Sequence, residues 1–587
     1  MNASYRILRL WPWLAALASG LLARLCFAPF DQAWLCWLAL TPLLCAVWFS
    51  GQDTRRRWRR DWLLGYVAGV VFFWSVFSWL RTVTVPGLIL VGVYLGVYFA
   101  LWSWLAGRLR PAPRKPKPLA GLEAVTRRLE EKRARERAGI LPNESFVGVG
   151  VPNESSPTLS PWLSSYANLR RAFLLAAAWV TLETIRGRLF TGWGWNTLGH
   201  ALHAQWAMIQ IVEYTGVPGL SFLVAFTNVV LVCTVCRFID ETRARRRRPH
   251  FEFTLTMAAI VGVISYGVRA VQERGETTTV RVAALQPDIP REEKFSADAA
   301  EHTFATFARL SQAALQTKPD LIMWPESSMP GPVMQDEGSY RFVMDFAAAA
   351  RTDLLLGAID VDEKAAYNAA LLVSDGGAKV QLYRKLHLVP FGEYVPGRNS
   401  IPGIGWIVGQ QVPEDFGVGT KHVVFQMTRA DVRLAPLICF EDTIGDLARQ
   451  FVLPHKDAAT GKMLPGANLL ANVTNDGWFL RTAGSQQHLD NAIFRCVETR
   501  LPMVRSANTG VTCFINEFGR VTQRLADENG SQFTQGVLSG EVQVPVDYEP
   551  TFYVRHGELF AEGCAIVTAA TLLVLLGQRL VRQKSAA

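Results

Sequence analysis

Three short segments in the second half of the chain contain side chains that could act together in nucleophilic catalysis: Met323–Glu326, Tyr383–His387 and Leu437–Glu441. Each lies at or near the end of an apolar run of strand length. Cys439 is the strong nucleophile of the set. A neighbouring Lys385 ammonium would lower the pKa of its thiol, and the Glu326 carboxylate could shuttle its proton. The pattern therefore indicates an enzyme that works through a cysteine.

Taken singly, each of these residues also has an ordinary structural explanation. Glu326 could equally be a solvent-facing acid after a strand, and Lys385 alone would more often be a surface lysine. Cys439 alone would more often be a buried core cysteine. However, Phe440-Glu441-Asp442 after it reads as a strand-to-helix turn of the kind that exposes a nucleophile. The joint pattern, rather than any one residue, favours catalysis.

The composition indicates a chain divided between membrane and water. Of its 587 residues, 50% are hydrophobic, 19% are charged and 19 are tryptophans. The long apolar runs concentrate in residues 1–272, whereas residues 273–556 have the composition of a globular domain. The net charge of +10 does not indicate a nucleic-acid surface, because the arginines cluster between apolar runs instead of on one globular face.

The nine cysteines show no paired framework. Residues 273–556 hold only Cys439, Cys496 and Cys513, an odd number that fits at least one free thiol. Cys233 and Cys236 have redox spacing, but they lie within an apolar run, which favours a structural role. Histidines are scattered without ligand spacing and no glycine-rich phosphate loop is present, so we expect neither a metal nor a cofactor.

Eight apolar runs are long enough to predict membrane-spanning helices, which need about 20 residues each. The first is not a cleavable signal, because no small-residue cleavage site follows it and a second run comes at once. The runs are Trp11–Phe27, Ala33–Phe49, Trp62–Leu80, Val85–Ala106, Ala172–Ile185, Trp206–Cys236, Leu255–Val271 and Phe560–Leu580.

The basic residues predict how these runs are oriented. Arginines precede the first run, cluster at residues 55–60 and 243–248, and follow the eighth run, and residues 107–171 are rich in both Lys and Arg. The alternate loops carry few positive charges. The positive-inside rule therefore places both termini in the cytoplasm and residues 273–556 on the opposite side. The predicted division is a membrane domain over 1–272, an extracytoplasmic domain over 273–556, and a last helix with a cytoplasmic tail over 557–587.

Residues 111–165 read as a basic cytoplasmic insert. Their first part, Pro111–Pro118, is too rich in proline for helix or sheet. A solvated or lipid-surface linker explains the segment better than a specific partner site.

From Thr279 onward, short strands alternate with helices, which predicts a layered α/β domain. Asp375-Gly376-Gly377 is typical of a hairpin turn. Expected helices are Ala299–Thr317, Gly338–Ala350 and Gly484–Thr499. Expected strands are Val280–Leu285, Leu321–Trp324, Leu354–Ala358, Ala369–Ser374, Val380–Tyr383, Arg433–Cys439, Leu469–Val473, Met503–Ala507, Val511–Ile515 and Gly536–Val544.

These motifs resemble the nitrilase superfamily, the carbon–nitrogen hydrolases, whose members use a Glu-Lys-Cys triad on an α-β-β-α sandwich. The match extends to Tyr367-Asn368, to His387–Pro396 and to Asn475–Phe479. With eight spans around such a domain, the chain further resembles the apolipoprotein N-acyltransferase family, integral membrane enzymes of bacterial lipoprotein biosynthesis. Phe27–Phe30 and Gly192–Asn196 support that resemblance, and residues 111–165 are longer than the family's usual loop.

The resemblance implies ping-pong acyl transfer in the bacterial inner membrane. Cys439 would take an acyl chain from a phospholipid, phosphatidylethanolamine being the expected donor, as a thioester. It would pass the chain to the α-amino group of an N-terminal diacylglyceryl-cysteine. Glu326 would be the general base and acid, and Lys385 would stabilise the oxyanion. We expect the enzyme to act as a monomer.

The resemblance also implies roles around the triad. Glu441 is expected to orient Lys385, and Glu393 to polarise it or assist proton transfer, although structural salt bridges explain both equally well. Trp478, Phe479, Phe391 and Phe440 are candidate acyl-chain contacts or ordinary core aromatics, and Phe295 falls where the family carries an aromatic lid residue.

Two rival interpretations remain at this stage. A membrane-tethered nitrilase-type amidase would use the same triad but would need only one span as an anchor. A transporter or binding protein with a degenerate nitrilase-like domain would need charged or polar residues within the spans to line a path, and such residues are sparse here. It would also not need an intact triad.

Overall fold

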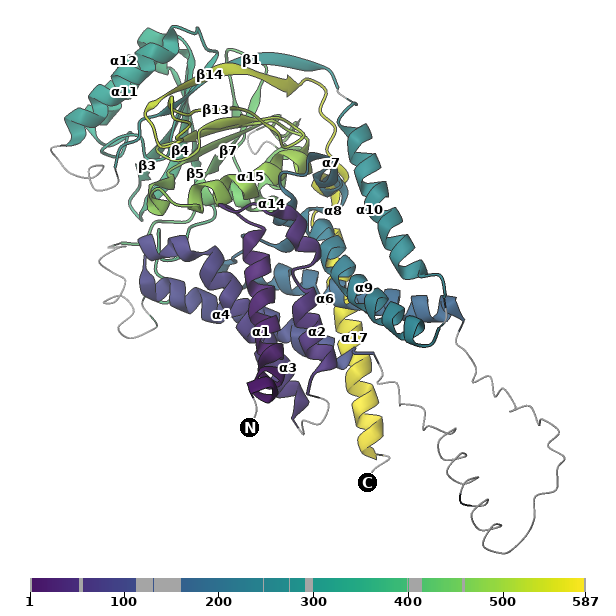
Figure 1. Ribbon diagram of the computed structural model, residues 1–587. Helices are drawn as coiled ribbons and strands as arrows, with labels where there is room; N and C mark the ends of the chain where they lie inside the picture. The colour runs from purple at the N-terminus through teal and green to yellow at the C-terminus, as the bar shows by residue number, and fades with distance from the viewer. Residues whose placement is uncertain are drawn as a thin grey trace, which may run out of the picture.

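The computed structural model describes residues 3–51, 56–111, 130, 160–245, 247–273, 275–290, 299–398, 400, 414–456 and 460–584. It has two parts, a layered domain of sheets and helices and a bundle of helices (Figure 1). Helix α1 (Ala3–Leu25) begins and α17 (Leu559–Lys584) ends at the end of the bundle away from the sheets. Phe295 and most of the insert expected over 111–165 lie outside the described residues.

The layered domain is built on two six-stranded sheets. The central strands of each sheet run parallel and the flanking strands antiparallel. In spatial order the first sheet contains β14 (Gly536–Pro545), β1 (Thr277–Gln286), β2 (Leu321–Trp324), β3 (Asp353–Val361), β4 (Ala366–Ser374) and β5 (Lys379–Arg384). The second contains β13 (Val521–Arg524), β12 (Cys513–Ile515), β11 (Met503–Ala507), β10 (Leu469–Thr474), β7 (Arg433–Ile438) and β6 (Phe425–Gln426).

Successive side chains along a strand point to opposite faces of the sheet, and this alternation gives each sheet an inner and an outer apolar layer. Val282 of β1 packs in one buried cluster with Leu434 of β7, between the sheets, whereas its neighbour Ala283 packs with Phe307 on the outer face. Helices α11 (Ala299–Leu315) and α12 (Glu337–Ala350) cover that outer face. Helices α14 (Gly445–Val452) and α15 (Gly484–Thr499) lie between the second sheet and the bundle (Figure 1). The predicted α/β layering is therefore present as an α-β-β-α sandwich.

The strands and long helices predicted for this domain are confirmed, with β2, β11 and α15 matching their predicted bounds. The sequence did not predict α14, which has eight residues. It also missed the short strands β6, β8 (His455–Lys456), β9 (Met463–Leu464) and β13. Strand β13 is exposed at every position, so it carries no apolar alternation by which to recognise it.

The bundle contains the other long helices, and the expected spans map onto them with changes. The run Trp206–Cys236 is not continuous, because Gly216, at φ +60°, separates the short helices α7 (Trp206–Ile209) and α8 (Val212–Thr215) from α9 (Val217–Arg243). The run Ala33–Phe49 is divided into η1 (Ala33–Trp37) and α2 (Thr41–Phe49).

Two further boundaries differ from those expected. The run Trp62–Leu80 is divided into α3 (Arg57–Val76) and η2 (Ser78–Thr82). Helix α6 (Pro161–Arg186) begins well before the expected Ala172, so residues 161–165 belong to it and not to the insert. The Ser160 hydroxyl accepts from Trp162 N, and Pro161 fits the first helical turn, where no backbone N–H is needed.

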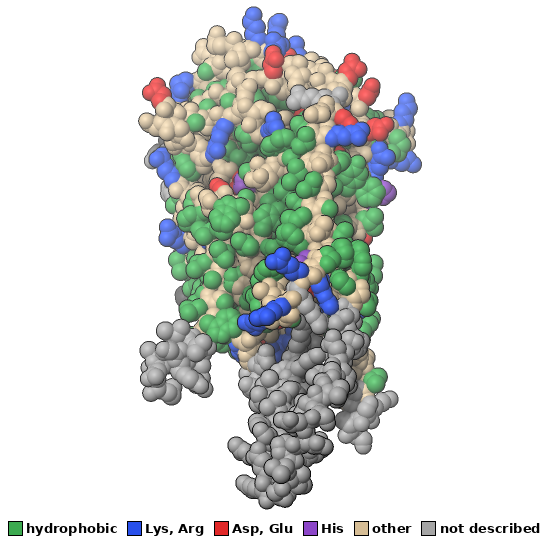
Figure 2. Space-filling view, turned by 45° about the vertical axis from the view of Figure 1, so that its right-hand side comes forward, with side chains coloured by type: hydrophobic (Ala, Val, Ile, Leu, Met, Phe, Trp, Pro, Cys, Tyr) green, Lys and Arg blue, Asp and Glu red, His purple; other side chains and the backbone are tan. Residues whose placement is uncertain are grey.

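Among the described residues, four helices are long and apolar enough to cross a membrane: α4 (Val85–Arg108), α9, α10 (Phe251–Ala270) and Leu559–Val581 of α17. Much of their apolar surface is exposed, for example at Leu90, Val261 and Leu573. Figure 2 shows hydrophobic side chains covering the middle of one face of the molecule, with charged side chains at the sandwich end and Lys and Arg at the lower edge. Such a band fits a surface in contact with lipid.

The bundle and the sandwich are joined through a buried polar residue, Gln487 of α15. Its Oε1 accepts from Trp79 Nε1 at 2.9 Å and from Asn196 Nδ2 at 3.0 Å. Its Nε2 donates to Ala28 O at 3.0 Å and to Val76 O at 3.2 Å. Four positions of the bundle therefore converge on one amide, including one in each of the segments Phe27–Phe30 and Gly192–Asn196 noted in the sequence.

We predict that Gln487→Ala destabilises the junction. Two buried donors and two carbonyls would lose partners, and each unsatisfied buried group costs about 1–3 kcal/mol. The thermal midpoint of the purified protein in detergent, followed by tryptophan fluorescence, should fall well below that of the wild type. The matched control is Gln450→Ala at an exposed position of α14. Equal midpoints for the two variants would show that Gln487 does not join the two parts.

Candidate active site

Cys439 lies directly after β7, where the chain turns sharply into η6 (Cys439–Thr443). Its backbone has φ +50°, a left-handed conformation that is uncommon for a residue with a side chain. The Cys439 carbonyl accepts from Asn472 Nδ2 of β10 at 3.2 Å. The strand end and this bond hold the turn, and the side chain lines a cavity.

Glu326 and Glu393 are joined by an asparagine that the sequence analysis noted but did not place in the site. Glu326 follows β2, and its Oε1 accepts from Asn368 Nδ2 at 2.6 Å. The same nitrogen donates to Glu393 Oε1 at 2.6 Å. Asn368 belongs to β4, and all three side chains are buried. Asn368 therefore holds two carboxylates side by side.

Lys385 provides the positive charge that these carboxylates need. It follows β5 and has no exposed surface. Its Nζ lies 2.8 Å from Glu393 Oε2 and 3.9 Å from Glu326 Oε1. Burial by itself would lower the pKa of Lys385, but the negative charges around it, chiefly that of Glu393, outweigh burial and hold this pKa above its ordinary value. Lys385 is therefore an ammonium.

The pKa of Cys439 differs from the expectation that a neighbouring ammonium would lower it. Burial raises the pKa of the thiol well above its ordinary value, and Glu326 adds to the rise. Lys385 and a hydrogen bond with Thr474 act in the opposite direction without cancelling it. The free site consequently holds a neutral thiol, and such a thiol becomes a strong nucleophile only when a base takes its proton.

Glu441 acts on Lys385 through the backbone. Its Oε1 accepts from Leu386 N at 2.8 Å and His387 N at 3.1 Å, and its Oε2 accepts from Ile438 N at 2.9 Å. Burial raises the pKa of Glu441 to about 7, with Lys385 opposing the rise. Glu441 thus ties the segment after Lys385 to the strand before Cys439, whereas Glu393 makes the direct ion pair.

A cavity of about 580 Å³ opens over these groups. Glu326, Lys385, Glu393 and Cys439 all line it. The four aromatic candidates also line it, namely Phe391, Phe440, Trp478 and Phe479. The sequence prediction had therefore selected residues that the fold brings together.

The bundle supplies the apolar remainder of the cavity wall. Trp79, Trp193 and Trp195 line it together with Leu90 and Val91 of α4. The Trp79 ring lies 4.6 Å from Phe479, and the Trp195 ring stacks on Phe440 at 5.9 Å between centroids. The sequence did not predict that these bundle residues line the cavity. The Gly192–Asn196 motif, which contains Trp193 and Trp195, was the one sequence feature that pointed to them.

A buried charged cluster lies beside the cavity and was also missed. His488 of α15 lines the cavity and lies 2.9 Å from both Asp442 Oδ1 and Asp476 Oδ1. Arg505 of β11 pairs with the same two carboxylates. Burial and Arg505 lower the pKa of His488, but Asp442 and Asp476 outweigh them and raise it overall. The cluster ties the turn after Cys439 to β11 and α15.

Residues 281–546 match the family described as carbon-nitrogen hydrolase. Residues 19–125 and 156–230 match the apolipoprotein N-acyltransferase N-terminal domain. An apolipoprotein N-acyltransferase of Geobacter metallireducens is 32% identical over 97% of this chain and 95% of its own length. One of Rhodopseudomonas palustris is 29% identical over 98% of this chain and 97% of its own. A solved amidase of the nitrilase superfamily from Nesterenkonia is 15% identical, with a TM-score of 0.34, and covers 49% of this chain and 97% of its own.

We predict that removing the buried ammonium destabilises the protein. In Lys385→Met, the Glu326 and Glu393 carboxylates would face each other without a cation, and breaking a buried pair costs about 3–5 kcal/mol. Adding Glu393→Gln to this variant should recover part of the loss, because it removes one of the two charges. Thermal midpoints of the single and double variants measure this coupling.

The matched control is Arg341→Met, which breaks the exposed ion pair of Arg341 with Glu337 and should cost about 1 kcal/mol or less. If Lys385→Met is as stable as this control, Lys385 does not compensate the two carboxylates.

Proposed function

The chain belongs to the apolipoprotein N-acyltransferase family, and on this premise we propose that its acyl transfer takes place at Cys439 with Glu326 and Lys385. The donor is a phospholipid, with phosphatidylethanolamine as the expected species. The acceptor is the α-amino group of the N-terminal diacylglyceryl-cysteine of a lipoprotein. One observation carries the proposal: a half-buried cysteine, a buried lysine and a buried glutamate line a cavity whose remaining wall is apolar and comes partly from the bundle.

In the first half-reaction the Cys439 sulfur attacks the ester carbonyl carbon of the phospholipid. Because the thiol is neutral in the free site, Glu326 takes its proton as the C–S bond forms. The Lys385 ammonium and a backbone N–H near Cys439 stabilise the oxyanion, and such donors are worth about 3 kcal/mol each. The C–O bond then breaks, Glu326 returns the proton to the departing alcohol oxygen, and a lysophospholipid leaves a thioester on Cys439.

In the second half-reaction the α-amino nitrogen of the acceptor attacks the thioester carbonyl. Glu326 takes a proton from this nitrogen, Lys385 again stabilises the oxyanion, and the C–S bond breaks. The products are an amide and a Cys439 thiol that regains its proton from Glu326. The cycle therefore returns every proton and needs no cofactor.

Three supporting residues, Glu393, Asn368 and Glu441, favour Glu326 as the group that accepts and returns the proton. Glu393 makes the close ion pair with Lys385, at 2.8 Å, whereas Glu326 lies farther away at 3.9 Å. Glu326 is consequently the less firmly neutralised of the two carboxylates. Asn368 fixes the position of both, and Glu441 fixes the backbone that carries Lys385.

The apolar wall of the cavity favours a lipid donor over a small amide. Leu90 and Val91 of α4, together with tryptophans of the bundle, offer an acyl chain a surface that excludes water. Exclusion of water matters because hydrolysis of the thioester would waste the acyl group. A tethered amidase would have no use for this wall, and a transporter would have no use for the paired carboxylates and lysine.

We further propose the membrane arrangement predicted from the sequence. Residues 1–272 provide seven spans and the basic insert, which ends before α6 begins at Pro161. Residues 273–556 form the periplasmic catalytic domain, and residues 557–587 provide the eighth span. Both termini are cytoplasmic and the membrane is the bacterial inner membrane. Since the proposed catalytic residues all come from one chain, we expect a functional monomer.

The first test is intact-mass analysis of the purified protein after incubation with phosphatidylethanolamine. The wild type should gain the mass of one acyl chain, and hydroxylamine should remove it. Cys439→Ala should gain nothing, whereas the matched control Cys45→Ala, at a half-buried thiol of α2, should be acylated like the wild type. An adduct that persists in Cys439→Ala would refute the nucleophile. An unacylated wild type that hydrolyses small amides would favour the amidase.

Labelling of introduced cysteines tests the arrangement in the membrane. Lys364→Cys lies at an exposed turn between β3 and β4, and Arg247→Cys lies in the exposed segment between α9 and α10. In spheroplasts an impermeant maleimide should label the first variant and should label the second only after lysis, with the wild type as background. Labelling of Arg247→Cys in intact spheroplasts would reverse the proposed orientation.

A further inference from the structure

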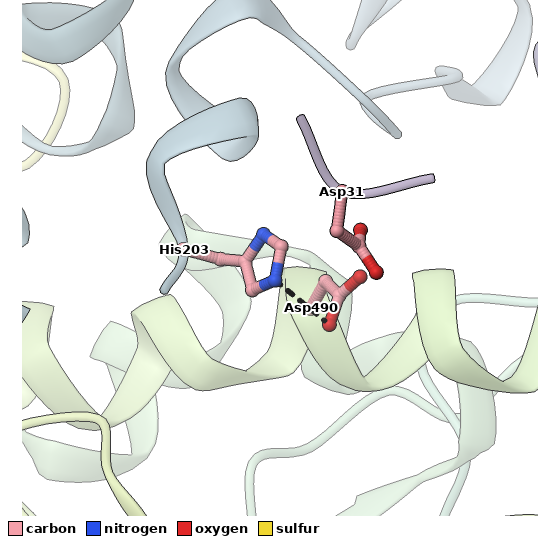
Figure 3. A group of neighbouring side chains, drawn as sticks. All are labelled: Asp31, His203 and Asp490. Carbon is pink, nitrogen blue, oxygen red and sulfur yellow. Dashed lines mark ion pairs between the residues drawn. The ribbon is translucent and has the colours of Figure 1, made fainter. Parts of the chain in front are cut away.

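A group of three side chains far apart in the sequence meets at the junction between the bundle and the sandwich. Asp31 lies in the segment after α1, His203 follows the short helix η4 (Leu198–Leu202), and Asp490 belongs to α15. One nitrogen or oxygen atom from each lies within 4.8 Å of the others. Figure 3 shows the imidazole and the two carboxylates pointing toward one another from three separate elements.

The His203 ring is oriented as a metal ligand would be. Its Nδ1 lies 3.2 Å from His200 O, so this nitrogen carries the proton and donates to the carbonyl. In the neutral ring the lone pair is then on Nε2, and Nε2 faces Asp490 Oδ1 at 3.5 Å. Metal-binding histidines commonly donate their second ring nitrogen to a backbone carbonyl in this way. Ligand atoms about 2.0–2.1 Å from one ion at tetrahedral angles lie roughly 3.3 Å apart, close to this separation.

Asp490 is the buried member of the group, with a side chain only 5% exposed. Gln486 Nε2 donates to its Oδ1 at 2.7 Å. In the described part of the chain, Oδ2 accepts no hydrogen bond, and it points toward the carboxylate of Asp31. Two carboxylates that face each other repel, and a cation or a shared proton between them relieves this repulsion.

We propose that Asp31, His203 and Asp490 bind one divalent metal ion of the zinc or manganese class, which ties the bundle to the sandwich. One imidazole nitrogen with two carboxylates suits these ions better than Ca²⁺ or Mg²⁺, which prefer oxygen ligands. Three protein ligands leave room for water at the remaining positions. Two ligands come from the bundle and one from α15, so the ion joins the same parts as Gln487.

The proposed ion is structural and takes no part in the acyl transfer. Asp490 is two residues from His488, which lines the catalytic cavity. Residues two apart on a helix differ by about 200° in direction, so Asp490 points away from the cavity. The competing explanation is a proton shared between Asp31 and Asp490, with His203 pairing to Asp490 directly.

The test uses the full-length, tag-free protein in detergent, stripped of metal with a chelator. Zn²⁺ and Mn²⁺ are added separately, with Ca²⁺ and Mg²⁺ as comparisons, and bound metal is counted by mass spectrometry after desalting. The wild type should retain about one ion per chain and show a thermal midpoint several degrees higher with metal than without. Co²⁺ should give visible absorption bands typical of a site with one nitrogen and several oxygen ligands.

Matched variants locate the site. Asp31→Asn, at an exposed position, His203→Gln and Asp490→Asn should each lose the retained ion, the midpoint shift and the Co²⁺ bands. His302→Gln, at an exposed histidine of α11, should behave like the wild type, and so should Cys439→Ala, which separates this inference from the proposed function.

A wild type that retains no Zn²⁺ or Mn²⁺ and shows no midpoint shift would overturn the proposal in favour of the shared proton. Retention of the ion by all three variants would overturn it as well. If Asp490→Asn does not fold, Asp31→Asn and His203→Gln decide the question.

Discussion

The catalytic end of the sandwich is organised around one ammonium group with no exposed surface, that of Lys385. A charge taken out of water must be compensated by nearby opposite charge and hydrogen bonds. Glu393 provides the close partner at 2.8 Å and Glu326 the distant one at 3.9 Å. Asn368 helps to hold these two adjacent carboxylates together, because its Nδ2 donates a hydrogen bond to each of them. The same requirement keeps the Glu326 carboxylate close enough to act on the pKa of the Cys439 thiol.

The neutral thiol follows from the same burial. The apolar surroundings that raise the pKa of Cys439 would also help to keep water from the thioester of the proposed mechanism. In the proposed mechanism no thiolate is stored, and the nucleophile forms only as Glu326 accepts the proton, with Lys385 already in place for the oxyanion. The cluster of Asp442, His488 and Arg505 holds the turn after Cys439 from the other side.

The bundle has a role beyond attachment to a membrane, because it completes the cavity. Trp79, Trp195 and Leu90 contribute wall that the sandwich alone lacks. The position of this wall depends on the junction, where the buried amide of Gln487 bonds to four positions of the bundle. A polar junction of this kind fixes the position of α15 relative to the bundle, because each hydrogen bond requires a specific partner at a specific distance. The geometry of the cavity thus depends on contacts outside it.

Local pattern in the sequence was enough to predict the strand ends that carry Glu326, Lys385 and Cys439, the layered α/β domain and the apolar runs. These features depend on residues close together in the chain, through alternation, turn chemistry and uninterrupted hydrophobicity. The family resemblance added the expected roles of these three residues and the four aromatic candidates around them.

Other features were decided only by the tertiary structure. Asn368 as the bridge between two carboxylates, the raised pKa of Cys439, the backbone role of Glu441, and the tryptophan wall all depend on contacts between distant segments. The same holds for the break at Gly216 and for the meeting of Asp31, His203 and Asp490. Burial and the distance between charges set pKa values and ion pairs, and both quantities exist only once the chain has folded.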